Sequence, residues 1–180
     1  MVEYSFVDRP TKERIETLKK SFPEANASFV NLFLDIQWTY REMQKQYDHL
    51  FERYGLTETK FIILMFLYQE PNHQLLPSAL SEKLGSTRAT VTKVINGLER
   101  NSWIIKQSSS LDKRSVIVQL THEGKELIEK FLPENYRAVS LIMSTLNTTE
   151  QEELVSLLNK IKLGTKKMQN EMELDSNANK

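Results

Sequence analysis

Residues 86–100 read STRATVTKVINGLER, and this stretch decides what the rest of the chain can form. On a helix, which turns by about 100° per residue, one side of the stretch is apolar. The apolar stripe consists of Val91, Val94, Ile95 and Leu98. We therefore expect a helix that is capped by Ser86 or Thr87, buries this stripe and ends near Arg100.

The opposite face of the same helix is small, polar or basic. It presents Ala89, Lys93, Asn96 and Arg100, with Thr90 and Thr92 on its flanks. A helix that enters a DNA major groove needs such a face, because phosphates repel carboxylates while amides and cations donate to phosphates or base edges. A solvated face is the alternative, but it would carry charges of both signs, and here the first acid is Glu99. The pattern favours DNA.

A shorter helix is predicted immediately upstream. Residues 78–84 follow Pro77, which suits a first helical turn, and Gly85 ends them. A short helix, a tight turn and a second helix make the helix-turn-helix arrangement. Thr57 caps an earlier helix that reaches about Tyr68, and this helix is so apolar that we place it at the centre of the domain.

Two strands are predicted downstream. Residues 103–107 (WIIKQ) and 116–120 (VIVQL) are rich in β-branched side chains, and a polar, turn-prone segment separates them. A two-stranded hairpin directly after a helix-turn-helix is a wing. Its tip carries Asp112, Lys113 and Arg114, a pattern in which a carboxylate can orient an arginine for a minor groove. A generic charged turn is the alternative.

A long helix is predicted on the N-terminal side of this lobe. Apolar residues recur at spacings of three and four from about Glu24 to Tyr54, and a short helix over residues 10–21 precedes them. Such a stripe is normally buried against partner helices, and we expect a second copy of the chain to supply some of them.

Further helices are predicted after the wing. Thr121 caps one helix, which Pro133 should kink or interrupt. Thr148 and Gln151 form a capping box for the last helix. The apolar face of that helix consists of Leu154, Leu157, Leu158 and Ile161. From about Met172 onwards we expect disorder.

Together these elements predict a mainly α fold with a small β-wing (α+β). We expect five segments, namely an N-terminal extension with a short helix (1–23), an N-terminal dimerisation helix (24–56), a winged helix-turn-helix DNA-binding lobe (57–120), C-terminal dimerisation helices (121–170) and a disordered tail (171–180).

Positive charge is concentrated in the lobe, since residues 77–120 hold seven basic and three acidic residues in a chain whose net charge is zero. A chance fluctuation of charge is the alternative.

Several classes of function are excluded or disfavoured. The chain has no Cys, which excludes disulfides, thiolate metal sites and thiol catalysis. We expect neither an enzyme nor a cofactor, because glycine-rich phosphate loops, nucleophile elbows and clusters of His with carboxylates are missing. The three His do not have the spacing of metal ligands. With no signal peptide and no apolar run of about 20 residues, we expect a soluble cytoplasmic protein with no membrane partner.

The order of these motifs resembles the MarR family of bacterial transcription regulators. The resemblance spans residues 26–165 and rests on residues 56–57 (LT), 80–84 (LSEKL), 86–93 (STRATVTK), 98–100 (LER), 112–115 (DKRS) and 120–124 (LTHEG). It implies a homodimer whose two winged lobes straddle pseudo-palindromic double-stranded DNA, with Arg114 in the minor groove, Asp112 orienting it and the helix from Thr87 in the major groove. The predicted DNA-binding residues are Thr87, Arg88, Thr90, Thr92, Lys93, Asn96, Asp112, Lys113 and Arg114.

The resemblance has departures and one further implication. Ser102 stands where the family often has Gly, Ser108 to Ser110 stand where it often has Asp-Pro-like residues, and the extension over residues 1–23 is longer than the family minimum.

The resemblance also implies a candidate ligand cleft. Many members of the family release DNA when a phenolic or other lipophilic molecule enters a cleft beside the lobe. The candidate lining residues here are Trp38, Arg41, Phe61, Met65 and Tyr68. Plain core is the alternative for these side chains.

Two functions remain open at this point. One is a sequence-specific regulator, most simply a repressor, with a small-molecule effector. The other is a winged-helix protein-interaction adaptor that does not bind DNA. An adaptor need not keep acids off the helix over residues 86–100 or place cations on the wing, so the residues favour the regulator.

Overall fold

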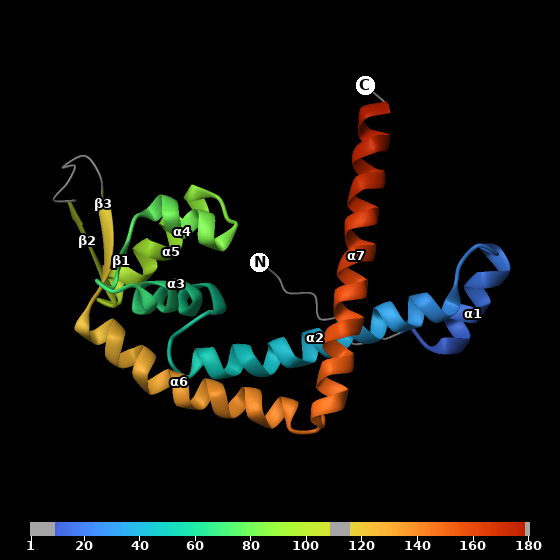
Figure 1. The fold of residues 1–180 in the computed structure, drawn as a ribbon, viewed down its shortest axis with the longest axis horizontal. Helices are drawn as coiled ribbons and strands as arrows, with labels where there is room; N and C mark the ends of the chain where they lie inside the picture. Colours follow the sequence, from blue (N-terminus) through green and yellow to red (C-terminus); the bar gives the residue numbers. More distant parts are fainter. Residues whose placement is uncertain (1–9, 109–115, 179–180) are drawn as a thin grey trace. The chain divides into compact units, whose positions relative to one another are not determined.

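The structure, a computed structural model, describes residues 10–108 and 116–178. It is mainly helical with one small antiparallel sheet, which confirms the predicted fold class (Figure 1). The elements are α1 (Lys12–Ser21), α2 (Ala27–Glu52), α3 (Glu58–Gln69), β1 (Gln74–Leu75), α4 (Pro77–Leu84), α5 (Arg88–Arg100), β2 (Ile104–Ser108), β3 (Val116–Leu120), α6 (His122–Met143) and α7 (Thr148–Ala178).

The chain divides into two compact units, Met1–Ile128 and Glu129–Lys180. In the first unit α3, α4 and α5 pack together beside the sheet, and one apolar core joins them (Figure 1). The most deeply buried side chains of this unit are Ile63, Leu64 and Leu67 of α3, Leu80 of α4, Val91, Ile95 and Leu98 of α5, Ile104 of β2, Val118 of β3 and Ile128 of α6. The central place predicted for α3 is confirmed by this burial.

The ends of the helices in this unit follow the predicted signals. Thr57 caps α3 by accepting a hydrogen bond from the backbone N–H of Lys60 at 3.3 Å. Gly85 ends α4 in the left-handed conformation at φ +58°, which glycine adopts without a steric penalty. Of the two caps proposed for α5, Thr87 is the one that forms.

The sheet has three strands in the order β1-β3-β2. In the wing Ile104 lies opposite Leu120 and Ser108 lies opposite Val116, so the two predicted strands pair in register along their length. The strand β1, in which Gln74 pairs with Gln119, was not predicted. Two residues are too few to show a period, and only the neighbouring β3 makes them a strand.

The C-terminal helices differ from the prediction in their continuity and their cap. Pro133 does not interrupt α6, which continues through it as a single helix although proline removes one backbone donor. The cap of α7 lies one residue earlier than predicted. Asn147 accepts from the N–H of Glu150 at 3.0 Å, and the Glu150 carboxylate accepts from the N–H of Asn147 at 2.8 Å. The local sequence allows both boxes, and the charged carboxylate is the stronger acceptor.

The length of α7 also differs from the prediction. Disorder was expected from about Met172, whereas the helix continues to Ala178. Within residues 10–108 and 116–178, no helix is both long enough and apolar enough to cross a membrane.

Candidate nucleic-acid interface

The exposed face of α5 holds the residues that were predicted to meet DNA in the major groove. Val91, Ile95 and Leu98 are buried, so the packing of this stripe sets which way the helix faces. Thr90, Thr92, Lys93 and Asn96 lie away from this stripe and are exposed, and Arg88, which is next to the stripe in the first turn, is exposed as well. The packing of the core therefore leaves five of the nine predicted residues exposed on α5, immediately after the cap Thr87.

The first turn of α5 is arranged to suit an anion. The Thr87 hydroxyl accepts from the N–H of Thr90 at 3.2 Å and is hydrogen-bonded to the Thr90 hydroxyl at 2.9 Å. The Thr92 hydroxyl donates to the backbone carbonyl of Arg88 at 2.8 Å, which leaves its oxygen free to accept. This turn contains no acidic residue, so the positive end of the helix dipole and the Arg88 side chain act together.

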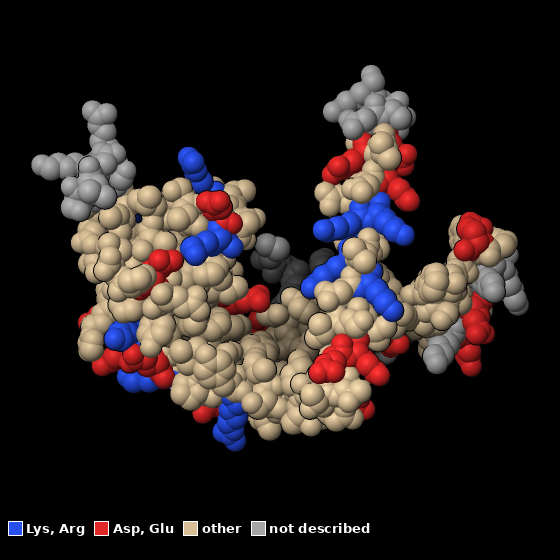
Figure 2. All heavy atoms as spheres, viewed as in Figure 1, with Lys and Arg blue, Asp and Glu red and all other residues tan. Residues whose placement is uncertain are grey.

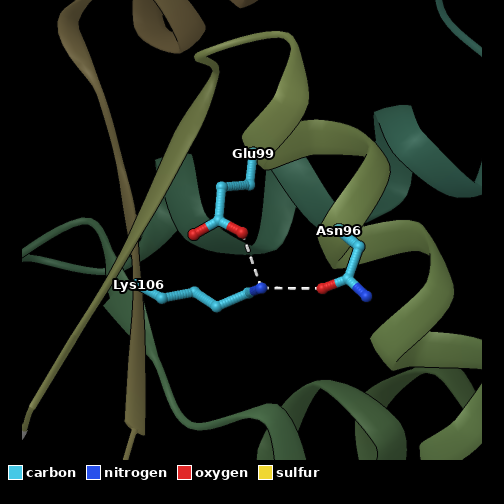
Figure 3. Close-up of polar contacts among 3 residues, drawn as sticks. All are labelled: Asn96, Glu99 and Lys106. Carbon is cyan, nitrogen blue, oxygen red and sulfur yellow. Dashed lines mark hydrogen bonds and ion pairs between the residues drawn. The ribbon is translucent and has the colours of Figure 1, made fainter.

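A side chain from the wing reaches the far end of this face. The Lys106 ammonium, on β2, donates to the Glu99 carboxylate at 2.6 Å and to the Asn96 side-chain oxygen at 2.7 Å (Figure 3). Asn96 is one of the predicted DNA contacts, whereas Lys106 contributes only to the predicted positive charge of residues 77–120. The sequence offers only a weak indication that Lys106 would meet Asn96 and Glu99, because contacts between a helix and the strand after it have no fixed spacing in sequence.

The turn between α5 and β2 places Ser102 in a conformation that glycine adopts more readily. Ser102 has φ +59°, in the left-handed region that favours glycine. The N–H of Ser102 donates to the carbonyl of Glu99 at 2.9 Å, and the N–H of Trp103 donates to that of Leu98 at 3.1 Å. These two bonds form a Schellman motif, so the helix ends in the ordinary way although the residue is not glycine.

A corner of four residues joins the end of α5, the wing and the start of α6. The Thr121 hydroxyl donates to the Ser102 carbonyl at 2.7 Å and accepts from the N–H of Gly124 at 3.0 Å. The N–H of Thr121 donates to the Trp103 carbonyl at 3.1 Å. A Cβ atom on Gly124 would overlap that same carbonyl oxygen, so only glycine fits here. The corner therefore holds the base of the wing against α5.

The remaining three predicted residues belong to the segment between β2 and β3. Asp112, Lys113 and Arg114 lie outside the described residues, which resume at Val116. Their roles remain predictions, and the described part of the wing consists of the strands β2 and β3, which pair from Ile104 and Leu120 to Ser108 and Val116.

Comparisons with known proteins agree with this fold. The family model of the transcriptional regulators SarA/Rot matches residues 45–131. The chain is 31% identical over 149 residues to the transcriptional repressor YetL of Bacillus subtilis, covering 83% of this chain and 89% of YetL. Sco3205, a MarR family transcriptional regulator of Streptomyces coelicolor solved in complex with DNA, superposes with a TM-score of 0.69 at 21% identity, over 78% of this chain and 89% of Sco3205.

The chain belongs to the MarR family of winged helix-turn-helix transcription regulators. Its class is DNA-binding and regulatory, not enzymatic. Another structure of the same fold is BpsR of Bordetella bronchiseptica, with a TM-score of 0.57 and 23% identity over 71% of this chain and 92% of BpsR. The DNA binding of BpsR is regulated by 6-hydroxynicotinic acid.

The residues predicted to form a ligand cleft in this MarR-family chain lie on α2 and α3. On α2 the Arg41 guanidinium lies 5.4 Å from the centre of the Trp38 ring. On α3 the Tyr68 ring stacks on the His73 ring, with 5.8 Å between the ring centres, and the centre of the Phe61 ring lies 5.6 Å from that of Phe51. Met65 is half-buried. A cleft lined by all five predicted residues stays a prediction. In the described part of the chain, no group of three His, Asp or Glu side chains could hold a metal ion.

Proposed function

We propose that this MarR-family regulator binds a pseudo-palindromic operator as a homodimer and represses the genes beside it. In this proposal α5 enters the major groove of each half-site and the wing enters the adjacent minor groove. The exposed face of α5 carries the proposal, because it is free of acids up to Glu99 while the buried stripe behind it fixes its direction.

The roles of the side chains follow from their reach and chemistry. Arg88 and Lys93 are long cations that can bond phosphates or the acceptor edge of guanine. Thr90 and Thr92 are short enough to let the helix approach the base edges. On the wing, Arg114 would enter the minor groove with its guanidinium oriented by Asp112, and Lys113 would meet a phosphate.

Dimerisation is supported by apolar side chains that a single chain leaves in water. On α2, Phe29 is 71% exposed and Phe33 is 60% exposed. On α7, Leu157 is 54% exposed and Ile161 is 43% exposed. Helical stripes of this kind mark interaction surfaces, and a second copy of the chain is the occupant we propose.

The charges of α7 are also segregated along its length. Its lysines gather in the middle of the helix, whereas acidic residues lie towards both ends (Figure 2). The lysines are Lys160, Lys162, Lys166 and Lys167, and the acids are Glu150, Glu152 and Glu153 at one end and Glu171, Glu173 and Asp175 at the other. Lysines of one α7 helix would meet acids of a second, antiparallel copy only if the two-fold axis lay between the lysines and one acidic end, because an axis at the middle of the helix would place lysines opposite lysines.

We also propose that a small lipophilic or phenolic molecule releases the DNA. The support comes from the aromatic and apolar side chains of α2 and α3, and from the regulation of BpsR by 6-hydroxynicotinic acid. The effector would act by changing the spacing of the two lobes on the operator.

Selection of bound duplexes from fragments of the source genome, followed by a salt titration, tests the proposed function. A regulator that contacts several phosphates should lose about 10³-fold or more in affinity between 50 and 200 mM salt. If no fragment is retained at low salt, DNA binding is excluded for this chain, and the adaptor function takes its place.

A further inference from the structure

The contact between Lys106, Asn96 and Glu99 joins the wing to the face of α5 that the proposed function places in the major groove (Figure 3). We call these three side chains the α5–β2 clamp. An exposed ion pair contributes little to stability, so the main consequence of the clamp lies in the orientation of the groups it holds. The side chains of Lys106 and Glu99 are 30% and 41% exposed.

The clamp determines which way the Asn96 amide is turned. An ammonium group has three donors and no acceptor, so the atom that faces Lys106 at 2.7 Å is the amide oxygen and not the nitrogen. The nitrogen then points away from Lys106 (Figure 3). Asn96 is exposed, so its NH₂ group remains available to a ligand while its oxygen is already engaged.

This orientation changes what Asn96 can recognise on DNA. Asparagine reads adenine through two bonds, in which its oxygen accepts from N6 and its nitrogen donates to N7. In the clamp the oxygen already accepts a charge-assisted bond, and the nearby ammonium repels the N6 amino group. The free NH₂ group suits acceptors instead, namely guanine O6 and N7, thymine O4 or a phosphate oxygen.

Glu99 completes the arrangement because it holds Lys106 beside the helix. Its oxygen lies 2.6 Å from the ammonium, and Lys106 therefore sits between two acceptors of α5 instead of extending to a phosphate. The same contact neutralises the first acid on the DNA-facing side of the helix.

From this geometry we infer that Lys106 is a positioning residue that makes Asn96 a donor and biases the base pair facing Asn96 against adenine. The inference rests on the proposed function. It assigns a selectivity to one position of the operator, and it attributes that selectivity to a lysine that itself need not touch DNA.

The test uses the full-length protein, a duplex selected as its operator and a variant that removes the pair without changing net charge. This variant is Lys106→Met with Glu99→Gln. Asn96→Ala locates the base pair that Asn96 reads, because discrimination among the four bases should fall by about tenfold there. The wild type should disfavour adenine at that position. The pair variant should raise the relative affinity for adenine by about fivefold or more, and this rise should be absent when Asn96→Ala is also present.

A second readout separates positioning from a phosphate contact. Lys93→Met removes a cation that the proposed function assigns to DNA, and the slope of log affinity against log salt should become shallower by about 1. The pair variant should keep the wild-type slope. Thermal unfolding and the mass in solution should match the wild type for every variant, which shows that fold and assembly are intact.

Different results overturn different claims. An unchanged base preference in the pair variant, or a preference for adenine in the wild type, refutes the positioning role of Lys106. Full discrimination in Asn96→Ala refutes it as well, because no base contact then passes through this amide. All three results leave the proposed function standing. Failure of the wild type to bind any duplex refutes the proposed function and the inference together.

Discussion

Single residues at the two ends of α5, the helix proposed to meet DNA, set where it starts and stops. Thr87 satisfies a backbone N–H that the first turn would leave unpaired, and Ser102 takes the left-handed conformation that closes the last turn. Neither side chain lies in the core, and each affects the stability and direction of the whole face.

Thr87→Ala should lower the free energy of unfolding by about 1 kcal/mol, because the cap of α5 is lost. Thr87→Ser, which keeps the hydroxyl, should retain most of the stability. Urea unfolding of both variants measures the difference. Equal stability of the alanine and serine variants would show that the hydroxyl does not cap the helix in solution.

Ser102→Gly should raise the free energy of unfolding by about 0.5 to 1 kcal/mol. The left-handed conformation costs about 1–2 kcal/mol for a residue with a Cβ, and the greater freedom of glycine in the unfolded chain offsets part of the gain. The midpoint of thermal unfolding should rise accordingly. A lower midpoint would mean that the serine side chain stabilises this turn in a way that its φ angle does not reveal.

Arg114→Ala tests the wing at the residue scale. Loss of the guanidinium that the proposed function places in the minor groove should weaken operator binding by about tenfold or more while the protein remains a dimer. Equilibrium binding and sedimentation of the same sample measure the two properties. Unchanged affinity would remove the wing tip from the interface.

At the scale of elements, the corner of Ser102, Trp103, Thr121 and Gly124 determines how the wing sits beside α5. Its hydrogen bonds link three elements that are separate in sequence. The close approach of the α6 backbone to the Trp103 carbonyl makes the corner intolerant of any side chain at position 124.

Gly124→Ala should therefore lower the free energy of unfolding by about 3 kcal/mol, through overpacking against a backbone carbonyl. Gly97→Ala is the matched control, since Gly97 lies inside α5 and a Cβ there meets nothing within 4 Å. That control should be more stable by up to about 1 kcal/mol, because alanine is the better helix former. If both substitutions have the same effect, the corner is not as tightly packed as its geometry indicates.

At the scale of the whole molecule, the distribution of apolar surface is the basis of the proposed dimer. The lobe has its own buried core, whereas every residue of α7 with a described side chain is exposed in the single chain. A helix of this length with an uncovered apolar stripe is stable in water chiefly by packing against another helix.

Leu158→Glu should shift the protein from dimer to monomer, because it places a charge on the apolar stripe of α7. Ser156→Glu adds the same charge on the opposite side of the helix and should leave the dimer intact. Sedimentation equilibrium measures the mass of each variant. A Leu158→Glu variant that remains dimeric would exclude this stripe of α7 from the interface.

Local signals in the sequence were sufficient to predict α3, α4 and α5, both wing strands and the outward face of α5, whereas the continuity of α6 at Pro133 and the two ends of α7 were predicted wrongly. Thr57, Gly85 and Thr87 act at element ends through bonds to their own neighbours, so their effect does not depend on the rest of the fold. The apolar stripe of α5 is equally local, because the helical period alone decides which side is buried.

Only the tertiary structure decided which distant groups meet. The strand β1 exists because β3 pairs with it, the corner exists because α6 starts against the Trp103 carbonyl, and the α5–β2 clamp exists because the wing folds back along the helix. The periodicity of the sequence does not predict such contacts, because they depend on the relative orientation that the connecting turns give to the helices and strands. The acid-free face was therefore predictable from the sequence, whereas the orientation of the Asn96 amide on that face was not.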